Sequence, residues 1–89
     1  MGLRKMISQL EDFNKAFDFR IEHSPTLIPI GEAALNFKML EEENKEYIEA
    51  SYTKDIVETA DAIGDELYLV IGKICKHGLQ DKIEAIFSE

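Results

Sequence analysis

The sequence of 89 residues has one cysteine, Cys75, and no long apolar run. A single cysteine excludes an internal disulfide and fits a reducing compartment, so the Cys75 thiol is expected to serve core packing. No stretch approaches the length of a membrane-spanning helix, and the N-terminal segment lacks the apolar run of a signal peptide. These absences together predict a soluble, cytoplasmic protein with no membrane partner.

Basic residues are also scarce, because ten lysines and arginines stand against eighteen aspartates and glutamates, for a formal net charge of -8. This balance argues against a nucleic-acid backbone or an anionic membrane as a partner. A negatively charged protein can still bind a phosphorylated substrate if divalent cations lie between the two sets of oxygens. Nucleotides are therefore compatible with this composition, provided that metal is present.

Strand-like alternation, internal repeats and low-complexity segments are absent, whereas apolar residues recur at helical steps of three and four. The pattern predicts an all-α fold in a single domain, residues 1–89. The expected helices cover residues 3–17, 32–51, 55–76 and 81–87. A chain this short buries only a modest fraction of its surface, so oligomerisation is expected to add stability.

A long loop is expected between the first two helices, over residues 18–31, where two prolines and a glycine interrupt any helix. Loops of this length are uncommon in small domains and are often functional. Two interpretations stay open. Leu27, Ile28 and Ile30 could pack as a lid over the core, or the loop could shape a nucleobase pocket.

The second and third helices carry acidic side chains at steps of three and four, which place them on one face of each helix. The two acidic stripes are Glu42, Glu43 and Glu46 in one helix and Glu58, Asp61 and Asp65 in the other. Like charges at this spacing destabilise an isolated helix by about 0.2–0.5 kcal/mol per pair, and a bound cation would offset that. Solvated surface is the alternative, and Glu58 also fits a capping box with Asp55.

Apolar residues continue both acidic stripes, with Leu35 and Met39 before the first and Tyr68 and Leu69 after the second. A purely solvated face does not require them, so the pattern favours a partly enclosed carboxylate cluster, with another subunit covering the acidic side. Each helix has in addition a separate apolar side that is expected to form the core. Those core residues are Ala33, Phe37, Leu40, Tyr47 and Ile48, followed by Ile56, Ala60, Ile63, Leu67, Val70 and Ile74.

Clustered carboxylates without histidine or cysteine favour hard cations, here Mg²⁺ with Mn²⁺ as a possible substitute. Neither His23 nor His77 completes a Glu-x-x-His pair, which disfavours a di-iron site, and zinc lacks soft ligands. Cations held between two helices would bind a polyphosphate and lower the pKa of a bound water. A carboxylate not fully committed to metal could accept the proton of that water, which is the chemistry of phosphoanhydride hydrolysis.

Resemblance to a known family rests on two segments, residues 40–47 (LEEENKEY) and 58–68 (ETADAIGDELY). They resemble the paired Glu-Glu-x-x-Glu and Glu-x-x-Asp helices of MazG-like nucleotide pyrophosphohydrolases and the related phosphoribosyl-ATP pyrophosphohydrolases. Residues 13–17, 24–26 and 77–78 also look like the phosphoribosyl-ATP branch. The resemblance implies a four-helix all-alpha NTP pyrophosphatase-like bundle completed by oligomerisation, as a homodimer or homotetramer. Relatives tend to continue past the fourth helix into a polar segment that can help hold substrate.

Carried over onto this chain, the resemblance implies six metal ligands. Two of them, Glu43 and Glu46 in the second expected helix, are also the candidate general bases. The six are Glu42, Glu43, Glu46, Glu58, Asp61 and Asp65. Two registers are open for the second segment. Glu58 with Asp61 satisfies Glu-x-x-Asp literally, whereas Asp65 matches the acid that precedes the family's apolar run. The residue three before Asp65 is Ala62, which departs from the family pattern.

The activity implied by the resemblance is cleavage of the α–β phosphoanhydride of a ribo- or deoxyribonucleoside triphosphate, giving the monophosphate and pyrophosphate. Hydrolysis of phosphoribosyl-ATP is an alternative that uses the same metal chemistry on a different substrate. A non-catalytic helical oligomerisation or regulatory module is a further alternative, from a different class of function.

Overall fold

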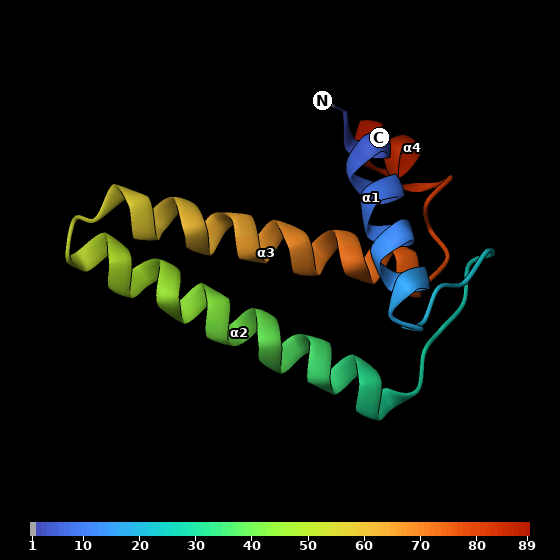
Figure 1. Cartoon of the computed structure of the whole chain (residues 1–89), viewed down its shortest axis with the longest axis horizontal. Coiled ribbons are helices and arrows are strands. Elements are labelled where there is room, and N and C mark those ends of the chain that lie inside the picture. The colour runs from blue at the N-terminus through green and yellow to red at the C-terminus, as the bar shows by residue number, and fades with distance from the viewer. Residues whose placement is uncertain (1) are drawn as a thin grey trace. The chain divides into compact units, whose positions relative to one another are not determined.

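A computed structural model describes residues 2–89. In this range helices are the only regular secondary structure, which confirms the all-α prediction (Figure 1). The four helices are α1 (Leu3–Ala16), α2 (Ile30–Tyr52), α3 (Ile56–Lys76) and α4 (Ile83–Ser88). α2 begins two residues before its predicted start because the Pro29 carbonyl already accepts the amides of Glu32 and Ala33, at 3.0 Å each. No helix in the described range has both the length and the hydrophobicity needed to cross a bilayer.

The chain forms two compact units, one made of residues 1–28 and 71–89 and the other of residues 29–70. α3 contributes to both, with its C-terminal turns in the first unit and its N-terminal turns in the second. Each unit is described by itself below. The prediction of one domain over residues 1–89 stays a prediction.

The core of the first unit lies between α1 and the C-terminal turns of α3. Its buried members are Ile7, Ile71, Ile74 and Cys75, and Leu3, Met6, Leu10, Leu79 and Ile83 pack around them. Cys75 is fully buried, and this burial, with the nearby charge of Glu11, raises the pKa of its thiol to about 11. A neutral buried thiol is a poor nucleophile, so the predicted packing role of Cys75 is confirmed.

The long loop of the first unit runs across the C-terminal end of α3 and supplies hydrogen-bond donors to its last carbonyls. The Glu22 amide donates to the Cys75 carbonyl (3.1 Å), and the Thr26 amide donates to the His77 carbonyl (2.9 Å). His77 Nδ1 lies 2.8 Å from the Thr26 carbonyl and donates to it. Terminal helix carbonyls have no partner within the helix, so the loop satisfies a need that the helix cannot.

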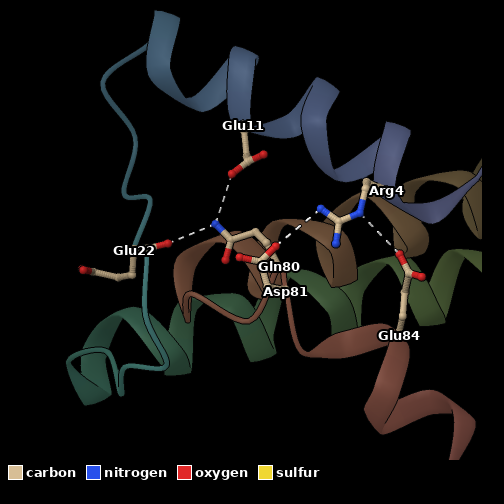
Figure 2. Close-up of polar contacts among 6 residues, drawn as sticks. All are labelled: Arg4, Glu11, Glu22, Gln80, Asp81 and Glu84. Atoms are coloured by element: carbon tan, nitrogen blue, oxygen red, sulfur yellow. Dashed lines mark hydrogen bonds and ion pairs between the residues drawn. The ribbon is translucent and has the colours of Figure 1, made fainter.

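The lid interpretation of the loop is wrong for two of its three residues. Leu27 is 92% exposed, and Ile30 is 85% exposed at the start of α2. The loop is instead held by the backbone bonds described above and by the side chain of Gln80. Its Nε2 atom donates to the Glu22 carbonyl (3.0 Å) and to Glu11 Oε2 (3.3 Å) (Figure 2). Arg4 forms exposed ion pairs with Asp81 (3.4 Å) and Glu84 (3.8 Å). Exposed pairs of this kind contribute little to stability.

Replacing Gly78 should destabilise the first unit more than any other glycine change in it. Gly78 has a φ of +67°, and a Cβ at this position would collide with the backbone of Ser24. We expect Gly78→Ala to lower the free energy of unfolding by about 1–3 kcal/mol from the left-handed backbone alone, with the collision adding to this cost. Thermal unfolding of the full chain measures the change.

Gly72→Ala is the matched control, because Gly72 lies within α3 and a Cβ there meets no atom within 4 Å. Alanine has a higher helix propensity than glycine in a helix interior, so this variant should be at least as stable as the parent. Equal melting temperatures for the two variants would contradict the role assigned to Gly78.

The second unit is a hairpin of two antiparallel helices, formed by α2 and the N-terminal turns of α3 (Figure 1). Its buried residues are few and small: Asn36, Ala50 and Ala62. The predicted core side of the hairpin is exposed in the single chain, with Phe37 at 64% and Ile56 at 77%. Two helices can bury only the strip along which they touch, so large side chains outside that strip need another layer. The core assignment is therefore wrong for these large side chains of the hairpin in the single chain, whereas Ile74, from the same predicted set, is buried in the core of the first unit.

Candidate metal centre

Three carboxylates converge between the two helices of the hairpin. Glu43 and Glu46 come from α2 and Asp65 from α3, and each offers an oxygen that lies within 4.8 Å of the other two. The step of three from Glu43 to Glu46 keeps both side chains on the face of α2 that meets α3. This cluster, called here the carboxylate triad, is the one group of three potential ligands found among the described residues 2–89.

Glu43 is the most enclosed member of the carboxylate triad. Its Oε2 atom is buried and has no hydrogen-bond partner in the described structure. Burial first, and then hydrogen bonding and charge repulsion from Glu46 and Asp65, raise the pKa of Glu43 from 4.5 to about 7. Three repelling carboxylates with an unsatisfied buried oxygen are what a hard cation would neutralise, so the donor set fits Mg²⁺ or Mn²⁺.

A groove of about 440 Å³ runs from the carboxylate triad along the hairpin toward the turn between the helices. It is lined by Glu46, Glu49, Ala50, Thr53, Glu58, Asp61, Ala62 and Asp65. No lysine or arginine is among these residues, so within the described chain the groove presents carboxylate oxygens with no opposing positive charge.

Glu58 lines this groove, and only its backbone amide takes part in the expected capping box. Asp55 Oδ1 accepts the Glu58 amide at 3.1 Å, which confirms Asp55 as the cap of α3. The other half of a capping box would use the Glu58 carboxylate to accept the Asp55 amide. That amide instead donates to the Ala50 carbonyl at 3.1 Å. The Glu58 carboxylate is therefore left to line the groove.

The remaining sequence-predicted ligands are divided between the groove and the outer surface. Asp61 lines the groove but lies outside the carboxylate triad. Glu42 lies on a different part of α2, beside Glu41 and Lys45, and does not line the groove. Glu49 lines the groove although the sequence did not assign it to the site, and its signal was the step of three from Glu46.

The arrangement defines a class of protein: an all-helical chain whose helix hairpin presents a carboxylate site suited to a hard cation. A family model described as phosphoribosyl-ATP pyrophosphohydrolase matches residues 10–89, which is nearly the whole chain. The chain belongs to this family, and its domain is a pyrophosphohydrolase, a hydrolase that acts on anhydride bonds. The resemblance stated from the sequence is thereby confirmed, and this family is typically metal-dependent. No curated protein matches the chain.

Proposed function

We propose that this protein hydrolyses the α–β phosphoanhydride of a ribo- or deoxyribonucleoside triphosphate, using Mg²⁺ or Mn²⁺. The observation that carries the proposal is the convergence of Glu43, Glu46 and Asp65 on one point between α2 and α3. A nucleotide brings several negative charges to a groove that is itself negative, so a cation between the two is a physical requirement.

The carboxylate triad would hold the cation, and Glu58 and Asp61 extend the acidic lining of the same groove. When bound, the cation polarises a phosphoryl oxygen and lowers the pKa of a water molecule. Glu49 adds a further carboxylate to the groove. Asn36 and Ala50, both buried in the hairpin, help to fix the spacing of the two helices that carry the ligands.

Glu43 and Glu46 are the proposed general bases. One of them accepts a proton from the attacking water as its oxygen bonds to the α-phosphorus. The bond from the α-phosphorus to the bridging oxygen breaks, so the monophosphate and pyrophosphate leave.

Phosphoribosyl-ATP is a second candidate substrate, favoured by the description of the matching family. Hydrolysis of its α–β phosphoanhydride would use the same carboxylates in the same roles. The two candidates differ in the group attached to the base, not in the bond that breaks.

Pyrophosphate release from a panel of ribo- and deoxyribonucleoside triphosphates and phosphoribosyl-ATP, with Mg²⁺ or Mn²⁺, tests the proposal. We expect release from at least one substrate and none when a chelator removes the metal, because the groove offers no basic side chain to bind phosphate. Release from phosphoribosyl-ATP alone would select the second candidate. Silence across the whole panel with metal binding intact would favour the non-catalytic regulatory module.

The exposed apolar side of the hairpin supports assembly as a homodimer or homotetramer, which we include in the proposal. A cytoplasmic location is proposed as well, since the lone cysteine is a buried free thiol and the nucleotide substrates are cytoplasmic.

A further inference from the structure

The first unit contains a polar recess of about 290 Å³, lined by residues of α1, of the long loop and of the turn between α3 and α4. Sites for small molecules usually measure about 300–1,000 Å³, so this recess suits a ligand of amino-acid size. All of its lining residues belong to the first unit, whereas the carboxylate triad belongs to the second. The recess is therefore separate from the proposed hydrolytic site.

Three polar side chains of α1 line the recess in a row. Arg4, Ser8 and Glu11 follow one another at steps of four and three, which keeps them on one face of the helix. A cation stands at one end of this row, a carboxylate at the other, and a hydroxyl between them. α1 therefore offers opposite charges to a ligand at two separate points.

Gln80 supplies a buried, unused acceptor to the same recess. Its side chain is only 9% exposed, and its Nε2 atom donates to the Glu22 carbonyl (3.0 Å) and to Glu11 Oε2 (3.3 Å) (Figure 2). Both partners can only accept, so the nitrogen and not the oxygen must face them. Within the described residues no donor bonds to Gln80 Oε1, although the polar atoms of buried side chains usually have a partner. The amide is thus held in place with one acceptor left for a ligand.

Glu11 and Arg4 also keep unused hydrogen-bonding capacity. Glu11 accepts through Oε2, and none of the ion pairs described in the first unit includes it. Arg4 contacts Asp81 through Nη1 (3.4 Å) and Glu84 through Nε (3.8 Å), and both contacts are long and exposed. A guanidinium has five N–H donors, so Arg4 can still bind a carboxylate with the donors that these contacts leave.

We propose that this recess binds a small zwitterion, a molecule of amino-acid size that carries a primary ammonium group and a carboxylate. The ammonium group donates to Gln80 Oε1 and to the second oxygen of Glu11. The ligand carboxylate accepts from the Arg4 guanidinium and from the Ser8 hydroxyl. The proposal does not depend on the hydrolytic activity and goes beyond it.

Other ligand classes fit the recess less well. Two carboxylates, of Glu11 and Asp81, stand against the one guanidinium of Arg4, which disfavours a simple anion such as phosphate. A simple amine leaves the guanidinium without a carboxylate to bind. Glu11, Asp81 and His23 all line the recess, but they do not form a group of three converging metal ligands in the described chain.

NMR titration of the full-length chain tests the proposal. The probes are the common amino acids, β-alanine and 4-aminobutyrate, each added to about 10 mM. We expect at least one zwitterion to cause saturable shifts of the backbone amides of residues 4–11 and 80–81. Its N-acetyl derivative lacks the ammonium group and its amide derivative lacks the carboxylate. Each derivative should bind at least about tenfold more weakly, because each loses hydrogen bonds between charged groups.

Two pairs of variants assign the binding to the recess. Glu11→Gln and Arg4→Gln should each weaken binding of the same zwitterion at least about tenfold. Asp12→Asn and Lys5→Gln are the matched controls, since they remove the same charges from the neighbouring positions of α1 that do not line the recess. Both controls should bind within about twofold of the parent. Amide spectra of the free variants show whether each is folded as the parent is.

Three results would overturn the proposal. The first is the absence of saturable shifts from every probe. The second is binding of the N-acetyl or amide derivative as tight as that of the zwitterion, which would mean that only one charge is recognised. The third is an equal loss of binding in the control variants, which would place the ligand elsewhere or make its attraction to the chain non-specific.

Discussion

Glu46→Gln is expected to lower pyrophosphate release by about 10²–10⁴-fold, whether Glu46 serves as a metal ligand or as the base. Its carboxylate faces those of Glu43 and Asp65 with ligand oxygens within 4.8 Å, and an amide of the same shape supplies neither the charge nor the proton acceptor. Asp65→Asn should cause a loss of the same order. Calorimetric titration with Mn²⁺ should show weaker metal binding in both variants.

Glu84→Gln is the control for this experiment, because it makes the same chemical change on an exposed helix of the other unit. It should retain full activity and full metal binding. Unchanged Mn²⁺ affinity in both Glu46→Gln and Asp65→Asn would show that the cation is held elsewhere.

Glu42→Gln distinguishes the sequence motif from the geometry. The motif treats Glu42 as a ligand equivalent to Glu43 and Glu46, whereas the structure places it outside both the carboxylate triad and the groove. We expect a loss of less than about tenfold, well short of the loss in Glu46→Gln. An equal loss in the two variants would favour the motif over the geometry.

The case of Glu42 also shows why part of the site could not be predicted from the sequence. Steps of three and of four both keep side chains on one face of a helix, so Glu42 and Glu43 share a face with Glu46 equally well. Which of the two points into the hairpin depends on the direction from which α3 approaches α2. That direction is a tertiary property, and periodicity along α2 carries no information about it.

The two ends of α3 were predictable because each has a local physical cause. The Asp55 carboxylate caps the start of α3 by accepting the Glu58 amide. Gly78, with its positive φ, lets the chain turn away after the last turn of α3. The exposure of the apolar side of the hairpin was not predictable. Periodicity assigns Phe37 and Ile63 to the apolar face of each helix, but it does not say which other element covers that face. Nor did it reveal that the Asp55 amide has a backbone acceptor, the contact that releases Glu58 to the groove.

In the metal-free protein, Glu43 should make the fold less stable as the pH rises from about 4.5 to about 7. Its pKa is 4.5 in the absence of the fold and about 7 within it, so between these values the folded state holds a proton that the unfolded state has released. Raising the pH removes that proton and leaves a third repelling charge in the carboxylate triad. Glu43→Gln removes the titrating group, so this part of the pH dependence of the melting temperature should disappear.

Mg²⁺ should reverse this trend, because the cation and the proton compete for the same Glu43 oxygens. At a free Mg²⁺ concentration about 100 times its dissociation constant, binding to the folded state adds about 2.7 kcal/mol. For a chain of this size that corresponds to a rise in melting temperature of about 10–20 °C. The rise should be largest above pH 7, where Glu43 is ionised, and should shrink as the pH falls toward 5. A shift of equal size at pH 5 and pH 8, or one that persists in Glu43→Gln, would mean that the cation stabilises the protein from a site that does not include Glu43.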